Sequence, residues 1–144
     1  MSLKISVVTP EKVFLTSEAQ QIILPSISGR VGVLTGHAPF VTILKPGLLR
    51  YEGTTGLWVP AVIYGGVAEV INNKVTILVN GAEEVKPFND LDDVQLEMVD
   101  LIEKFQKLKM EGLKGSELDF ALSKMQIAQA RVFAIEYVRK NYPL

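Results

Sequence analysis

The chain has 144 residues, 48% of them hydrophobic, which allows one sizeable core, or a small core with an appendage, and excludes a disordered segment. Its 15 basic and 16 acidic residues give a formal net charge of -1, so it lacks the basic excess typical of nucleic-acid-binding proteins. It has no cysteine, which excludes disulfides, zinc–thiolate sites, iron–sulfur clusters and cysteine nucleophiles.

The N-terminal residues enter a strand-like pattern at once. Leu3, Ile5 and Val7 alternate with polar residues, and no basic or apolar leader precedes them. No apolar run approaches the roughly 18 residues that a membrane-spanning helix needs. We therefore expect a protein that is made in the compartment where it works and that meets a membrane only through a larger complex.

Up to about residue 85, short apolar and β-branched runs alternate with turn residues. Their spacing of roughly 8–12 residues is typical of a β-sandwich or barrel. The runs are Leu3–Val7, Val13–Leu15, Ala19–Leu24, Val31–Leu34, Phe40–Leu44, Leu48–Glu52, Leu57–Tyr64, Val67–Ile71 and Val75–Val79. We predict two domains, a β-sandwich over residues 1–86 and an antiparallel α-helical hairpin over residues 87–144.

Several signals mark turns and interruptions within the β half. Asn72-Asn73 separates two β-branched runs and predicts a tight hairpin, because asparagine tolerates positive φ. The segment Gly53–Gly56 predicts a slightly longer hairpin loop. Pro60 indicates a strand edge or a bulge, since proline cannot donate to a ladder. Gly65-Gly66 indicates a bend or a close backbone approach.

After residue 87 the apolar period changes to three and four, which is typical of amphipathic helices. Asn89 or Asp90 is the expected N-cap of the first helix, the segment Gly112–Gly115 ends it, and Ser116 with Asp119 predicts a capping-box restart. The apolar seams are Leu91, Val94, Met98, Leu101, Phe105 and Leu108 in the first helix, and Leu118, Ala121, Met125, Ala128, Val132 and Ile135 in the second.

The second helix is apolar on more than one side. Leu122, Ile127, Phe133 and Tyr137 lie off its main seam. From the sequence, a second docking surface and a wider buried stripe account for these residues equally well.

Residues that invite a catalytic or ligand-binding interpretation have simpler explanations. His37 is the single histidine and lies in a turn, so a structural or interface role is favoured over catalysis. The segment Gly29–Gly36 lacks the Gly-Lys-Ser/Thr ending and the following helix of a phosphate loop, which favours a shaped surface loop. The acidic cluster of the first helix lacks the spacing of a calcium loop and indicates a solvated face. We expect no catalytic residue, no metal and no cofactor.

Several segments, in order along the β half, resemble one known family. They are Val8-Thr9-Pro10, the stretch Gly29–Pro39 followed by Lys45-Pro46-Gly47, Gly65–Val70, and Val75–Val79 leading to Ala82-Glu83. Their pattern is similar to that of the epsilon subunit of F-type ATP synthases over residues 1 to about 85. The stretch Ile127–Val132 resembles the family's terminal helix, less distinctively.

The resemblance implies a β-sandwich of about ten strands followed by a helical hairpin. In the family, the sandwich packs on the gamma subunit and on the polar loops of the c-ring, and it turns with the rotor. The resemblance therefore implies that a rigid turn presenting Arg30 and His37 makes this contact. The candidate interface residues are Arg30, Val31, Gly32, His37, Ala38 and Pro39.

The resemblance also implies that the hairpin is a brake on ATP hydrolysis, which extends into the alpha/beta catalytic head and folds back again. Lys124 and Arg131 lie about two helical turns apart, so they share a face and are the expected contacts, together with Val132.

Some bacterial members of the family bind ATP through a motif whose start is matched here by Leu91-Asp92. Gln95 and Leu96 replace the arginine and alanine of that motif, which removes the expected phosphate partner. We therefore expect no bound nucleotide.

The leading interpretation is a non-catalytic rotor subunit that links gamma to the c-ring and restrains ATP hydrolysis. Ile22–Pro25 and Val79–Glu83 are more similar to plastid and cyanobacterial members, which implies the stromal side of the thylakoid, or alternatively the cytoplasmic face of a bacterial membrane. A stand-alone β-sandwich binding module with a helical lid is the alternative, and a small hydrolase is the least favoured.

Overall fold

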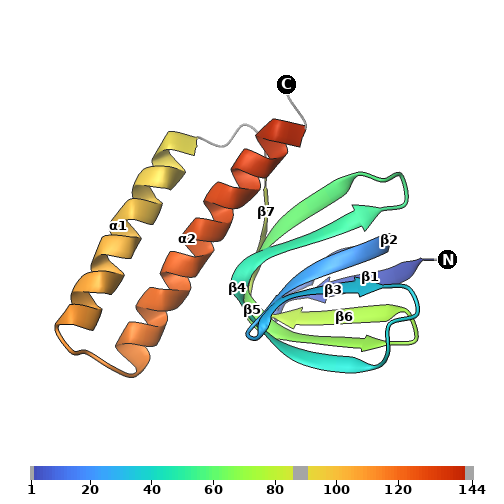
Figure 1. Cartoon of the computed structure of the whole chain (residues 1–144), viewed down its shortest axis with the longest axis horizontal. Helices are drawn as coiled ribbons and strands as arrows, with labels where there is room; N and C mark the ends of the chain where they lie inside the picture. The colour runs from blue at the N-terminus through green and yellow to red at the C-terminus, as the bar shows by residue number, and fades with distance from the viewer. Residues whose placement is uncertain (1, 86–90, 142–144) are drawn as a thin grey trace. The chain divides into compact units, whose positions relative to one another are not determined.

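A computed structural model describes residues 2–85 and 91–141 of the chain. The chain divides into two compact units, Met1–Glu84 and Val85–Leu144, and each is described by itself. The first unit is the β unit and the second the helical hairpin (Figure 1). The predicted boundary between residues 86 and 87 lies outside the described residues.

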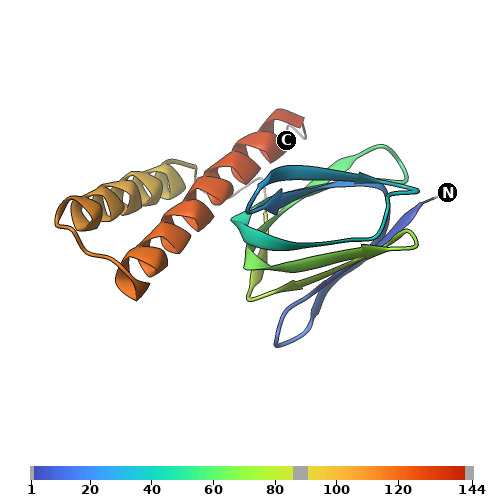
Figure 2. The same cartoon turned by 60° about the horizontal axis from the view of Figure 1, so that its bottom comes forward.

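The β unit contains a seven-stranded sheet. Its strands are β1 (Leu3–Val8), β2 (Val13–Ser26), β3 (Gly29–Leu34), β4 (Phe40–Gly53), β5 (Trp58–Ile71), β6 (Lys74–Val79) and β7 (Ala82–Glu84). The order is β1-β6-β5-β4-β2-β3, β7 pairs with β5, and β1 also pairs with β2. The pairings therefore close into a ring, and Figure 2 shows the strands in two layers.

Over residues 2–85, which the structure describes, the expected strand number of about ten is corrected to seven. Three strands, β2, β4 and β5, are 14 residues long, and each joins two runs that the sequence shows as separate. Strand β2 pairs first with β1 and then with β3, while β5 pairs with β7 and then with β6. A long strand that changes partner in this way contributes to both layers, so the strand count falls while the β-sandwich architecture stands.

At Gly65-Gly66 strand β5 bends and its backbone comes close to that of β6, as predicted. Gly66 has φ +158°, and a Cβ added there would lie 1.9 Å from the Leu78 carbonyl oxygen and 2.7 Å from Val79 Cα. No side chain fits in that space. The absence of a side chain at Gly66 therefore allows β5 to bend while it stays paired with β6.

The predicted turns of the β unit are also confirmed. Asn72 and Asn73 have φ of 49° and 63° and join β5 to β6, as a tight hairpin requires. The loop between β4 and β5 is closed by the Gly56 N–H, which donates to the Gly53 carbonyl oxygen at 3.0 Å. Pro60 of β5 pairs with Arg50 of β4 on one side. On the other side, the pairing of β5 with β7 starts at Ala61, so among the described residues Pro60 has no partner strand there and its missing N–H costs no ladder bond.

The interior of the β unit is a single apolar cluster. Inward-facing residues alternate with outward-facing ones along β1 and β6, where Leu3, Ile5, Val75 and Ile77 are almost fully buried. The largest buried side chains elsewhere in the cluster are Ile22, Leu24, Leu49 and Ile63. This cluster stabilises the unit without a disulfide, since the chain has no cysteine.

The hairpin consists of α1 (Leu91–Met110) and α2 (Ser116–Asn141). Gly112 and Gly115, with φ of 78° and 84°, lie in the connection, as the predicted helix break requires. The Gly115 carbonyl oxygen accepts the Asp119 N–H at 3.0 Å, so Gly115 takes the N-cap position and Ser116 is the first helical residue. The predicted capping role of Ser116 was therefore one residue out of place. The expected cap residues of α1, Asn89 and Asp90, lie outside the described residues.

The residues of both predicted seams are shielded from solvent. Every residue of the α1 seam is half-buried, and Ala128, Val132 and Ile135 of the α2 seam are buried. Off the α2 seam, Phe133 is 60% exposed. Within the described ranges, no helix has an apolar stretch long enough to cross a membrane.

Candidate docking surface

The stretch predicted as an interface loop is for the most part a strand. Residues Gly29–Leu34 form β3, antiparallel to β2, with Arg30 opposite Pro25, Val31 opposite Leu24 and Gly32 opposite Ile23. Val31 and Val33 favour the extended backbone, and the β2–β3 turn places the segment beside β2. The expectation of a shaped loop over Gly29–Gly36 was therefore wrong for residues 29–34, where β3 instead confirms the predicted strand-like run Val31–Leu34.

This strand separates Arg30 from His37. Arg30 lies near the start of β3, whereas His37 lies in the turn that follows its end, so one rigid turn does not present both side chains. Arg30, Gly32, Ala38 and Pro39 are exposed, and Val31 and His37 are half-buried. The two parts of the predicted site therefore lie at opposite ends of one edge strand.

The His37 turn has a defined geometry. The His37 N–H donates to the Leu34 carbonyl oxygen at 3.2 Å, and its Nδ1 lies 2.7 Å from the Ala38 carbonyl oxygen. The imidazole also meets the Phe40 ring edge-to-face, with centroids 5.7 Å apart. These contacts give His37 a part in the local structure of the turn, which is the structural role that the sequence favours over catalysis.

An apolar row that the sequence did not predict lies on the outer face of the sheet. In register across β4, β5, β6 and β1, Ile43 pairs with Val67, Val67 with Leu78, and Leu78 with Val8. Directly opposite residues on neighbouring strands point to the same face. Ile43, Val67 and Leu78 are 56%, 42% and 54% exposed, so the row faces outward. We call Val8, Ile43, Val67 and Leu78 the apolar row.

A signal for this row was present in the sequence. Strand β6 has apolar residues at Ile77, Leu78 and Val79 in succession, where a strand with one solvated face would alternate. Ile27 extends the surface, because its N–H donates to the Ile43 carbonyl oxygen at 3.0 Å and its side chain is 63% exposed. Contiguous apolar surface of this kind is typical of a protein–protein contact.

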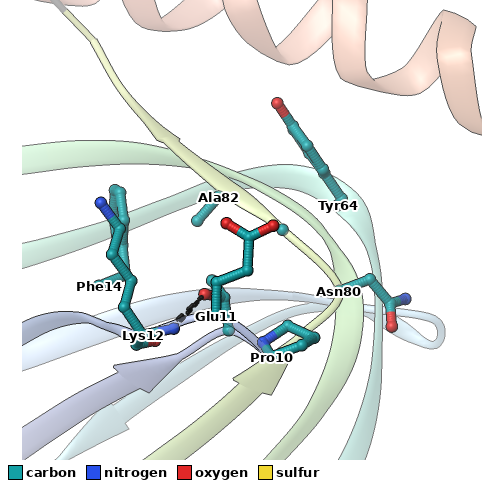
Figure 3. Close-up of a pocket in the computed structure, with 9 residues that line it drawn as sticks. Pro10, Glu11, Lys12, Phe14, Tyr64, Asn80 and Ala82 are labelled. Carbon is teal, nitrogen blue, oxygen red and sulfur yellow. Dashed lines mark hydrogen bonds between the residues drawn. The ribbon is translucent and has the colours of Figure 1, made fainter.

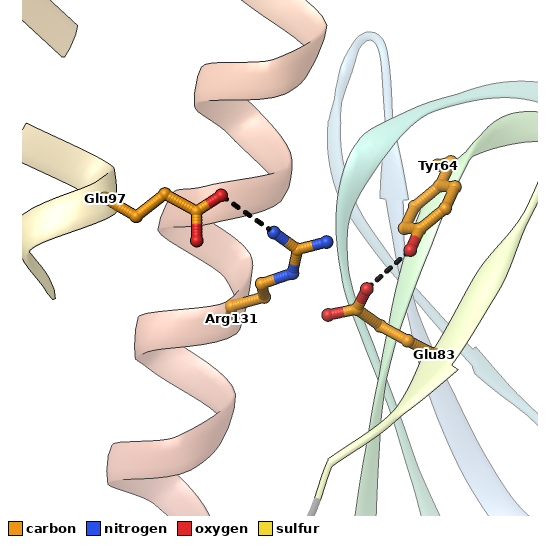
Figure 4. Close-up of polar contacts among 4 residues, drawn as sticks. All are labelled: Tyr64, Glu83, Glu97 and Arg131. Atoms are coloured by element: carbon orange, nitrogen blue, oxygen red, sulfur yellow. Dashed lines mark hydrogen bonds and ion pairs between the residues drawn. The ribbon is translucent and has the colours of Figure 1, made fainter. Parts of the chain in front are cut away.

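A small pocket of about 270 Å³ lies next to the end of the row. It begins at Thr9, directly after Val8, and includes Asn80, which follows β6. In Figure 3 the rings of Phe14 and Tyr64 and the charged side chains of Glu11 and Lys12 surround it; the remaining lining residues are Pro10, Gly81 and Ala82. Tyr64 Oη donates to Glu83 Oε2 at 2.5 Å, which ties β5 to β7 beside the pocket (Figure 4).

The hairpin residues predicted to contact a catalytic head are engaged within the hairpin. Arg131 of α2 donates from Nη1 to Glu97 Oε1 of α1 at 3.3 Å (Figure 4). The Lys124 ammonium lies 4.6 Å from the centre of the Phe120 ring, and Val132 is buried. In this conformation Arg131 and Val132 therefore stabilise the closed helix pair.

The degenerate nucleotide motif lies at the start of α1. Leu91 is half-buried in the seam and Asp92 is exposed. Gln95, which stands where the motif has arginine, lies 3.5 Å from Glu136 of α2, with its Nε2 as donor to Oε1. A carboxylate at this point would repel a phosphate.

Comparisons with known proteins decide the family. Residues 2–85 match the family model of the ATP synthase delta/epsilon chain, beta-sandwich domain. The chain belongs to the ATP synthase delta/epsilon chain family. It is similar to the chloroplastic ATP synthase epsilon chain of Pyropia yezoensis, with 40% identity over 93% of this chain and 96% of the relative. The chloroplastic epsilon chain of Guillardia theta is 37% identical over 94% of this chain and 98% of that relative.

Two solved structures contain a chain with the same fold. A chain of the Euglena gracilis mitochondrial ATP synthase matches with a TM-score of 0.71 and 22% identity, covering 95% of this chain and 81% of that one. A chain of the Tetrahymena thermophila mitochondrial ATP synthase central stalk and c-ring structure has a TM-score of 0.60 and 17% identity, over 94% and 97% of the two chains. These likenesses support the β-sandwich followed by two helices that the epsilon-type sequence predicts.

Proposed function

We propose that this chain is the non-catalytic epsilon subunit in the central stalk of a plastid-type ATP synthase. In this role the β unit is the rotor-binding domain, which joins the gamma subunit to the c-ring, and the hairpin is a regulatory domain that restrains ATP hydrolysis. The chloroplastic epsilon chains that resemble it over nearly their whole length support this assignment.

The observation that carries the proposal is the apolar row. Its exposed members form one band across neighbouring strands of a well-packed unit, and exposed contiguous apolar surface costs free energy until a partner covers it. We assign the gamma subunit as that partner, because a permanent stalk contact needs an apolar core of this kind. Membership of the epsilon family supports this choice of partner.

The c-ring contact is assigned to the turn end of the same face. The segment of β5 from Val67 to the Asn72-Asn73 turn spans about 17 Å as an extended strand, so the row and the His37 turn can serve two partners. The backbone polar groups of this turn are suited to contact the polar loops of the c-ring, where hydrogen bonds fix the relative position of the two proteins. The turn residues are His37, Ala38 and Pro39. Arg30, Val31 and Gly32, on the edge strand β3, would extend that contact.

A brake requires two arrangements of the hairpin that differ by a few kcal/mol. The half-exposed ion pair between Glu97 and Arg131 is weak enough to break at little cost. Its opening would remove one of the contacts that hold Arg131, which shares a face with Lys124, in the present arrangement.

Removal of the residues after Pro87 tests the brake. We expect assembly and proton coupling to be retained and ATP hydrolysis by the complex to rise about five-fold or more, at the lower end of typical coupling energies. The measurement is the hydrolysis rate of the assembled complex with and without a proton gradient. Hydrolysis equal to that of the wild type across the range of gradients would refute the brake.

The relatives support a plastid location for this chain. Chloroplastic epsilon chains are the similar proteins, including that of Porphyra purpurea at 40% identity, and we place this chain at the stromal side of the thylakoid as part of the complex. It would approach the membrane through the c-ring.

The second candidate function is a stand-alone binding module. The pocket between Phe14 and Tyr64 is the feature that favours it, since a side chain or small ligand could enter there. Co-expression with gamma separates the two functions. The epsilon assignment predicts stable co-purification of the full chain with gamma, whereas a free, monodisperse chain without affinity for gamma would favour the binding module.

A further inference from the structure

One asparagine residue links three separate segments at the turn end of the β unit, through its side chain and its backbone. Asn73, in the β5–β6 hairpin, accepts the Gly36 N–H at its Oδ1 with a distance of 2.7 Å. Its backbone carbonyl oxygen accepts the Lys4 N–H of β1 at 2.9 Å. The β5–β6 hairpin, strand β1 and the His37 turn are therefore joined through a single residue.

The contacts of His37 described above are all with residues 34–40, so they shape the turn without attaching it to the β5–β6 hairpin. Thr35, Gly36, Ala38 and Pro39 are exposed, so packing contributes little to their position. Gly36 has φ +83°, and its N–H donates to Asn73 in the β5–β6 hairpin. The hydrogen bond from the Gly36 N–H to the Asn73 side chain thus attaches the turn to the β5–β6 hairpin.

We propose that Asn73 is a positioning residue. Its carboxamide holds the His37 turn in the geometry that docks on the rotor. Its positive φ alone does not explain the side chain, because glycine would serve a left-handed turn position at least as well. The neighbouring Asn72 has the same backbone requirement, and the bond to Gly36 belongs to Asn73. The two asparagines therefore have different roles in one turn.

Holding the turn in advance lowers the entropy cost of docking. An exposed turn that samples several conformations must be ordered when it binds, and that cost subtracts from affinity. The inference rests on the proposed docking role of the turn, and it adds a specific residue outside the turn on which that role depends.

The experiment uses the full chain with three substitutions. Asn73→Gly keeps the left-handed backbone and removes the acceptor, Asn73→Asp restores an Oδ acceptor, and Asn72→Gly is the matched control in the same turn. Amide hydrogen exchange of Gly36, followed by NMR, reports the link itself. Affinity for a purified gamma–c-ring subcomplex from the same organism reports docking.

We expect Asn73→Gly to speed exchange at Gly36 about five-fold and to weaken binding about five-fold, as for the loss of one hydrogen bond. Asn73→Asp should recover most of both, and Asn72→Gly should change neither. Wild-type values for Asn73→Gly in either measurement would overturn the proposal, as would an unfolded spectrum, which would make Asn73 a folding residue. If the wild-type chain itself fails to bind the subcomplex, the proposed function fails, and the Gly36 exchange still tests the link.

Discussion

At the scale of single residues, the β unit depends on positions where space admits one residue type. Gly66 is the clearest of them, because the backbone of β6 occupies the volume of its missing side chain. The glycine pair predicts a bend from the sequence. Only the fold shows that β6 is the strand whose backbone lies against Gly66. At such a position the constraint is steric, and the backbone cannot move without loss of the β5–β6 pairing.

Gly66→Ala tests this constraint. We expect the free energy of unfolding to fall by roughly 2–4 kcal/mol, since the new Cβ would meet backbone atoms that cannot rotate away. Gly32→Ala is the control, because a Cβ at this strand position meets no atom within 4 Å, and its effect should stay within about 0.5 kcal/mol. Denaturant unfolding of the two variants gives the comparison, and equal stabilities would show that β6 adjusts to the added methyl group.

At the scale of elements, the sequence predicts helices and turns more accurately than strand continuity. The seams of α1 and α2 and the Asn72-Asn73 turn were correct, because each depends on local periodicity or on backbone φ. Strands β4 and β5 were each divided in two by the prediction. Proline and glycine occur both where a strand ends and where a long strand bends, so the sequence does not distinguish an end from a bend. The positions concerned are Pro46-Gly47 in β4 and Gly65-Gly66 in β5.

The hairpin is stabilised by its apolar seam more than by its charges. Glu97→Gln removes the ion pair with Arg131, and we expect it to lower the stability of the hairpin by less than about 1 kcal/mol, because both groups are partly exposed to solvent. Ile135→Ala, at a site that is 2% exposed, should cost about 2–4 kcal/mol. Hydrogen exchange along α1 and α2 measures both effects. A larger effect for Glu97→Gln than for Ile135→Ala would mean that the charge pair dominates.

At the scale of the whole molecule, the sequence identified the family and the turn that carries His37, and it missed the apolar row. Exposure of Ile43, Val67 and Leu78 depends on strand register, which joins residues far apart in the chain. Arg30 and His37 were grouped because they are near in sequence, and β3 separates them. A docking surface on a sheet is thus defined by pairing across strands, which local patterns do not report.

The central claim is that the β unit binds gamma through the apolar row, and the most direct test is the dissociation constant for gamma of full-length Val67→Glu. Val67 stands in the middle of the row, so a carboxylate there would be buried without a partner, and we predict weakening by about 100-fold or more. Leu57→Glu is the matched control, since Leu57 is 55% exposed in the β4–β5 loop outside the row, and it should bind as the wild type does. A Val67→Glu chain that folds and binds gamma with wild-type affinity would contradict the account.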